Sequence, residues 1–244
     1  MIDRAHMLAA SRDEGRQLAA PRVSEVTPSR RDFAQYVATQ KTDLAVIARL
    51  AGSSSHTAAQ LIAQARDYDD AEVAALAVAT GAGGLSAEIM AAIAAATTAP
   101  ILRDDLLMQP KQIYHARLHG ADAAVFPAAE LDGTDLHELI MIASSLHMAS
   151  VIEAFTPGHL DTARQFAHVI VGLRCTSTDG NLDVEATLDL ARRVPRQQTV
   201  IVLPEIRSPR ECAALRGTCD AVVAGEVLST ADDLCELLRE LAGD

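Results

Sequence analysis

The chain has 244 residues, enough to bury one large core, and its 49% hydrophobic content excludes a disordered protein. The net charge of −12 and the 3% aromatic content argue against a nucleic-acid partner, which requires a basic face or stacking platforms. No apolar run is long enough to span a bilayer and the first residues are unlike a signal peptide, so we expect a cytoplasmic protein with no membrane partner. None of the four cysteines forms a Cys-x-x-Cys pair, and we expect neither a metal nor a cofactor.

Residues 1–40 precede the first predicted strand and carry a helical pattern over residues 1–18, followed by Pro21, Pro28 and a short helix from Arg31. After residue 40, short apolar runs alternate with helical stretches, which is typical of a parallel sheet covered by helices. The predicted strands are residues 43–50, 73–78, 100–102, 123–126, 151–155, 169–174, 200–203 and 221–224.

The third strand and the helix after it form the clearest unit of the chain. An apolar run over residues 100–102 ends in three charged side chains, Pro110 opens a helix over residues 111–118, and Gly120 ends it. Ligand chemistry in α/β folds is found where parallel strands end. The first candidate functional residues are therefore Arg103, Asp104 and Asp105.

This unit resembles the indole-3-glycerol-phosphate synthase family. The chain has Pro-Ile-Leu-Arg-Asp-Asp-Leu from Pro100, Gln-Ile-Tyr from Gln112 and Gly-Ala-Asp-Ala from Gly120, where the family has roughly Pro-Val-Leu-Arg-Lys-Asp-Phe, Gln-Ile-Tyr and Gly-Ala-Asp-Ala. The resemblance extends from Arg31 to Leu228 with matched strand order. It implies a (β/α)8 TIM barrel over residues 41–244, with an N-terminal helical extension over residues 1–40 that covers the barrel mouth.

The family closes an indole ring on a phosphorylated anilino-deoxyribulose, with a lysine as general acid, a carboxylate partner and a phosphate seat after strands seven and eight. The resemblance places the strand-one glutamate and lysine of the family at Ala48 and Leu50, and its catalytic lysine at Asp104. A catalytic glutamate is kept as Glu153. The cationic acids of the family are therefore expected to be missing.

Further positions differ in the same way. The substrate-binding asparagine of the family corresponds to Arg174, its strand-seven serine to Pro204, and its phosphate-binding glycine to Glu205, whereas Gly225 and the serines after strand one are kept. The catalytic candidates are Glu153, Asp104 and Arg174. The ligand-binding candidates are Arg103, Asp105, Ser53, Ser55, Glu205 and Gly225.

The mixed charges at the mouth have two interpretations. They could bind a zwitterionic or cationic ligand through charge-assisted hydrogen bonds, or they could pair with one another and plug an unused site. A metal site of Asp104, Asp105 and Glu153 is a weaker possibility, because no histidine ligand lies nearby in the sequence.

Three functions follow from these observations. The first is a divergent family member that has lost ring closure and binds a small ligand or a protein partner. The second is a repurposed enzyme that acts on a non-phosphorylated substrate, using Glu153 with Asp104 or Arg174. The third is a working synthase, a carbon–carbon lyase of tryptophan biosynthesis, with relocated catalytic groups. The lost acids and bases favour the first, since each costs about 10²–10⁴ in rate.

Overall fold

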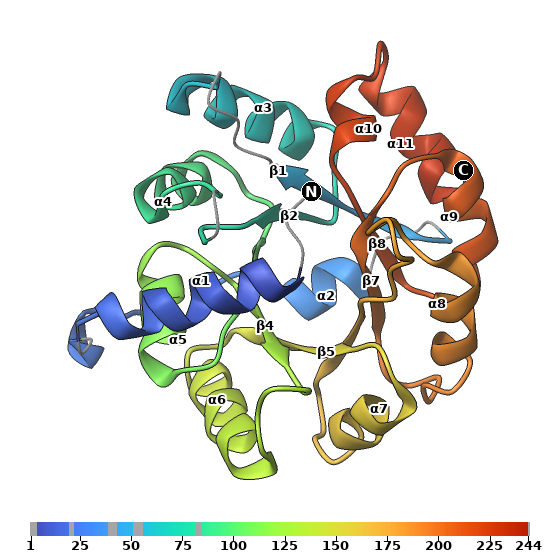
Figure 1. Cartoon of the computed structure of the whole chain (residues 1–244). Helices are drawn as coiled ribbons and strands as arrows, with labels where there is room; N and C mark the ends of the chain where they lie inside the picture. The colour runs from blue at the N-terminus through green and yellow to red at the C-terminus, as the bar shows by residue number, and fades with distance from the viewer. Residues whose placement is uncertain (1–3, 20–21, 39–42, 51–55, 82–83, 244) are drawn as a thin grey trace.

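The structure is a closed eight-stranded barrel. The computed structural model describes residues 4–19, 22–38, 43–50, 56–81 and 84–243, so Ser53 and Ser55 lie outside the described residues. All eight strands are parallel and pair in sequence order, and the eighth pairs with the first. The predicted (β/α)8 TIM barrel is therefore confirmed (Figure 1).

The helices and strands alternate along the chain after the N-terminal helices. The strands are β1 (Ala45–Leu50), β2 (Ala75–Val78), β3 (Ile101–Leu106), β4 (Ala123–Pro127), β5 (Ala149–Ala154), β6 (Ile170–Leu173), β7 (Val200–Ile206) and β8 (Ala221–Ala224). The helices are α1 (Arg4–Gln17), the short 3-10 helix η1 (Val23–Glu25), α2 (Phe33–Ala38), α3 (Ala58–Asp70), α4 (Ala87–Ala96), α5 (Pro110–Leu118), α6 (Gly133–Ser145), α7 (Pro157–Ala163), α8 (Val184–Ala191), α9 (Pro209–Leu215), α10 (Glu226–Ser229) and α11 (Leu234–Ala242). Among the helices of the described residues, none combines the length and apolar character that a bilayer crossing requires.

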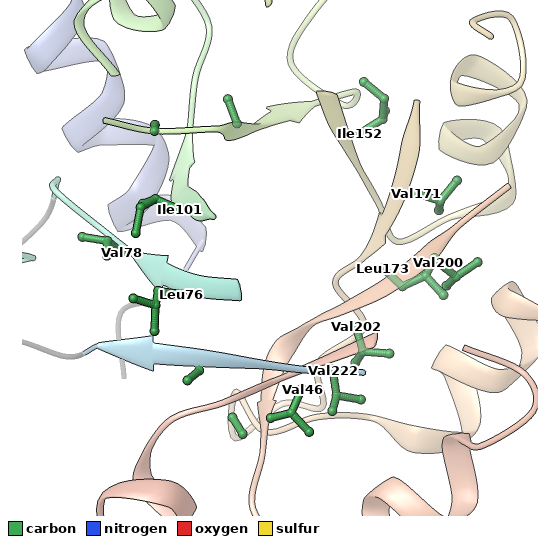
Figure 2. Packing of buried hydrophobic residues seen from close by; sticks show 14 of the residues in the cluster. Val46, Leu76, Val78, Ile101, Ile152, Val171, Leu173, Val200, Val202 and Val222 are labelled. Atoms are coloured by element: carbon green, nitrogen blue, oxygen red, sulfur yellow. The ribbon is translucent and has the colours of Figure 1, made fainter. Parts of the chain in front are cut away.

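Side chains alternate between the two faces of each strand, which produces two separate cores. Small and branched residues such as Ala45 and Ile47 fill the barrel interior. Their neighbours, such as Val46 and Ala48, point outward and pack against the ring of helices (Figure 2). The interior is tightly filled around Gly172, where an added Cβ would lie only 2.7 Å from a side-chain atom of Val151.

Local sequence signals determine where most of the helices begin. Ser86, Asp132, Thr156 and Ser208 each accept a backbone N–H from the first turn of the helix that they precede. Helix α3 has a full capping box between Thr57 and its third residue, so its N-cap is Thr57. The four-residue helix α10, between β8 and α11, was not expected from the pattern, nor was α7.

Two strands extend further than the sequence indicates. We expected the third strand to end at residue 102 and its charged residues to emerge at the surface. Instead β3 continues to Leu106, and Arg103, Asp104 and Asp105 are buried within it. Strand β7 likewise continues to Ile206. Both strands carry a register irregularity near these ends, which a hydrophobic run does not reveal.

The N-terminal helices contact opposite ends of the barrel. Helix α1 packs on β3 and α5 and crosses the face of the barrel (Figure 1). Helix α2 places Phe33 and Val37 in the barrel-interior cluster beside Ala45 and Ile170, at the end where the strands begin. The segment between them therefore runs from the mouth to the opposite end.

A buried carboxylate fixes this connection. Asp122, just before β4, is 1% exposed and accepts hydrogen bonds from Ser29 Oγ at 2.6 Å and from the backbone N–H of Ile101 at 2.9 Å. One of its carboxylate oxygens forms an ion pair with the guanidinium group of Arg117 at 2.6 Å, and the other forms one with Arg31 at 3.3 Å. One side chain thus joins the N-terminal segment, β3 and α5.

We predict that Asp122→Ala lowers the free energy of unfolding by about 3–5 kcal/mol, because it leaves two arginines and a strand N–H without their buried partner. Urea unfolding followed by circular dichroism measures the change. The matched control is Asp161→Ala, which removes a pair whose carboxylate is 69% exposed and should cost at most about 1 kcal/mol. Equal effects of the two changes would contradict the role given to Asp122.

Candidate functional site

A cavity of about 1060 Å³ lies at the mouth of the barrel. It is lined by residues that follow the C-terminal ends of β1, β2, β3, β5, β6, β7 and β8, and by Arg4 and Met7 of α1. This is the end of the barrel where active sites are built. A cavity therefore lies beside the charged residues of the mouth, which also pair with one another as the second interpretation expects.

The charged residues of the mouth continue the inward-facing series of their strands. In β1 the series is Ala45, Ile47 and then Arg49, whereas Ala48 lies among the outward-facing residues. Ala48 and Leu50, the positions that the family resemblance gives to ionisable side chains, thus belong to the outward-facing core cluster. The β1 position that faces the mouth holds the cation Arg49.

Alternating cations and anions form one connected chain across the mouth. We call it the mouth ion-pair chain, and its members are Glu205, Arg49, Asp104, Arg174, Glu153, Arg4 and Glu130. Arg49 pairs with Glu205 at 3.2 Å and also with Asp104. Arg174 bridges the next two acids, with Nη2 3.4 Å from Asp104 and Nε 2.6 Å from Glu153. Three candidates predicted from the sequence, Asp104, Glu153 and Arg174, are thus brought together.

Glu153 is a completely buried member of this chain. Its Oε1 atom accepts a hydrogen bond from Arg174, and its Oε2 atom accepts one from Arg4 Nε at 2.9 Å. Glu153 therefore pairs with Arg174 and Arg4, whereas Arg103 pairs with Asp105 and Glu14. Glu153 reaches the cavity only when one of the two guanidinium groups moves.

Arg103 and Asp105 form a second, structural cluster. Arg103 is fully buried and donates to Asp105 at 3.0 Å and to Glu14 of α1 at 2.6 Å. Asp105 in turn accepts the backbone N–H groups of Thr80 and Gly81 at 2.7 and 3.0 Å. This pair holds the loop after β2 and anchors α1, and only Asp105 also borders the cavity.

Glu205 and Gly225 meet where β7 and β8 end. A Cβ added at Gly225 would collide with the Glu205 carboxylate, so that carboxylate lies directly against the Gly225 backbone. Arg49 binds the other side of Glu205. An anion carried by the protein therefore fills the place where the family resemblance predicts the phosphate of a substrate.

The electrostatics of the mouth keep its arginines charged. Burial alone would lower the pKa of Arg49, but the charges of Asp104 and Glu205 outweigh burial and raise it above the usual value. The pKa of Arg103 is raised in the same way by Asp105 and Glu14. These guanidinium groups bind anions but do not release a proton near neutral pH.

The sequence did not reveal every member of the site. Arg49 could have been found by continuing the alternation of inward-facing and outward-facing residues along β1. No local sequence pattern marks Arg4 or Glu130 as site residues, because α1 and the loop after β4 come into contact only in the folded chain. Within the described residues, no three His, Cys, Asp or Glu side chains are placed to hold a metal ion. Cys175 borders the cavity, but burial raises the pKa of its thiol.

Comparisons with solved structures agree with the fold. The 3-hexulose-6-phosphate synthase of Salmonella typhimurium superposes with a TM-score of 0.64 at 18% identity, covering 82% of this chain and 97% of that protein. A tryptophan synthase alpha-subunit of Pyrococcus furiosus gives 0.60 at 17% identity, covering 83% and 99%. At these identities the likeness shows the barrel alone.

Sequence comparisons are more specific. Residues 2–241 match the family model of indole-3-glycerol phosphate synthase. A protein of that name from Aromatoleum aromaticum is 35% identical over 151 residues, which are 61% of this chain and 58% of the relative. Another from Delftia acidovorans is 31% identical over 144 residues, 58% of this chain and 54% of the relative. The alignments span somewhat more than half the length of these relatives, but the family model covers nearly the whole chain, and the chain therefore belongs to the indole-3-glycerol phosphate synthase family.

Proposed function

We propose that the barrel mouth binds a small non-phosphorylated metabolite, and that the ring-closing activity of the family is lost in this chain. The observation that carries the proposal is the position of Glu205, whose carboxylate rests against Gly225 and pairs with Arg49 at 3.2 Å. A substrate phosphate in that place would meet a like charge, which is unfavourable. The ligand is therefore expected to lack a phosphate at this end.

The same mouth lacks the proton donor of the family reaction. The chain has two lysines, Lys41 and Lys111. Lys111 lies on α5 and donates a hydrogen bond to the carbonyl oxygen of Leu18 at 3.1 Å. Lys41 lies outside the described residues, and in the sequence it precedes the first residue of β1 by four positions. Arg49, whose pKa is raised by Asp104 and Glu205, holds its proton too tightly to serve as a general acid.

The charge of the cavity favours a ligand with a cationic group. Four arginines line the cavity, Arg4, Arg49, Arg174 and Arg207, and the first three pair with carboxylates of the protein. Five acids line it, and they are Asp104, Asp105, Asp179, Glu205 and Glu226. The lining acids therefore outnumber the lining arginines. A zwitterionic or amine-bearing ligand complements this arrangement, and Glu153 with Asp104 and Arg174 would be the groups available for acid–base chemistry on it.

A second candidate function is ring closure by relocated groups. The match of residues 2–241 to the family model and the retained Glu153 favour it over complete loss of activity. In that case Arg49 and Arg174 would stabilise negative charge on the substrate electrostatically, in place of proton donation by lysine.

Direct assay separates the two functions. We predict that the purified chain, given the phosphorylated anilino-deoxyribulose, forms indole product at least about 10⁴-fold more slowly than a relative with both family lysines, because more than one acid or base is missing. Product fluorescence measures the rate. Turnover within about tenfold of that relative would establish the second candidate and overturn the first.

The anion seat has its own test. We predict that Glu205→Gly, which restores the glycine of the family, tightens the binding of inorganic phosphate at least about tenfold, since Arg49 loses one competing acid and Gly225 is uncovered. Isothermal titration measures the affinity. Glu226→Gln removes the same charge from the cavity without uncovering Gly225, and it should leave phosphate binding nearly unchanged. The same gain in both variants would show that overall charge, not the seat, is responsible.

A further inference from the structure

The guanidinium group of Arg4 sits in a pocket of its own at the edge of the mouth. It lies 2.9 Å from Oε2 of Glu153, 3.2 Å from Oε1 of Glu130 and 4.8 Å from the centre of the Phe155 ring. Two carboxylates and one aromatic face are the surroundings that proteins use to recognise organic cations. We name Glu130, Glu153 and Phe155 the cation seat.

The seat is formed by the barrel, and its occupant comes from elsewhere. Glu130 follows β4, Glu153 is in β5 and Phe155 comes directly after β5. The Phe155 ring is in turn held edge-on by His159, with the ring centres 4.4 Å apart. Arg4 arrives from the first turn of α1, 149 residues away in sequence from Glu153.

Glu153 gives the seat its strength. It is completely buried, and a buried carboxylate without a cation is costly. Arg174 satisfies only Oε1, at 2.6 Å, so Oε2 needs a second positive group. In this structure that group is Arg4, and the outer part of the seat borders the large cavity through both Arg4 and Phe155.

We propose that Arg4 is an internal substitute for a ligand, and that the cation seat binds a guanidinium or amine group of a small molecule when the start of α1 moves away. This proposal rests on the ligand-binding function proposed above and specifies its chemistry. The cationic end of the ligand takes the place of the Arg4 guanidinium over Phe155, and the rest of the molecule extends into the cavity.

Arg4 joins the first turn of α1 to the barrel through its ion pairs with Glu153 and Glu130. The middle and end of the helix have anchors of their own, which are hydrogen bonds from Gln112 to Ser11 and Glu14 and the Arg103–Glu14 pair at 2.6 Å. Arg4 is the described residue nearest the start of the helix, and its side chain remains 25% exposed. Withdrawal of the first turn therefore leaves the anchored part of α1 in place.

The test removes the internal competitor. In Arg4→Ala, methylguanidinium should bind at least about tenfold more tightly than in the wild-type chain, because a tethered group competes at an effective concentration in the millimolar range. Isothermal titration at low ionic strength measures both affinities. Arg4→Gln is a second variant that shortens the side chain and removes its charge while keeping a good helix former.

Two further variants identify the site of any gain. Arg12→Ala removes a cation from the same helix that pairs with Glu130 at 3.0 Å but does not reach Glu153, so it should bind methylguanidinium as weakly as the wild type. Arg4→Ala combined with Glu153→Gln should lose the gain, since the buried charge is gone. Circular dichroism confirms that each variant is folded.

Equal affinity in the wild type and both Arg4 variants would overturn the proposal, as would the same gain in Arg12→Ala. The result is independent of the ring-closure assay. Normal indole formation by the wild-type chain would refute the proposed function and leave the seat standing, whereas a failed gain in the Arg4 variants would refute the seat alone.

Discussion

The structure of the mouth depends on one constraint: Glu153 is a fully buried carboxylate and must be paired. Arg174 and Arg4 each form an ion pair with one of its two oxygens. Arg174 also pairs with Asp104, and Arg4 also pairs with Glu130. The pairing continues until it crosses the barrel from β7 to α1. Removing one member would leave its neighbour as a buried unpaired charge, so the members are energetically coupled.

The same coupling links the charged positions of the mouth to one another. The buried carboxylate of Asp104 requires cations nearby, and Arg49 and Arg174 provide them. Arg49 also pairs with Glu205, whose carboxylate lies against Gly225. These positions therefore form one consistent arrangement of charges and not a set of independent ion pairs.

Helix α1 connects this chemistry to the rest of the fold. Its later turns are fixed to β3 and α5 through Glu14 and Ser11, while its first turn supplies Arg4 to the seat beside β5. The same helix thus stabilises the barrel and covers Glu153. A ligand that competes with Arg4 acts on the first turn of the helix and leaves the anchors of its later turns in place.

The sequence alone determined the barrel, because eight apolar runs separated by helical stretches, and the order of motifs around residues 100–122, need no long-range information. It also gave Glu153, Asp104 and Arg174 as candidates, through the family resemblance and the charged residues that interrupt apolar runs. Tertiary structure decided the rest. The irregularity of β3 at Arg103, Asp104 and Asp105 depends on the pairing of this strand with β4. The inward direction of Arg49 depends on which residues of β1 alternate toward the barrel interior. The partnership of Arg4 with Glu153 joins residues 149 positions apart, and only packing of α1 across the closed barrel brings those charges within contact.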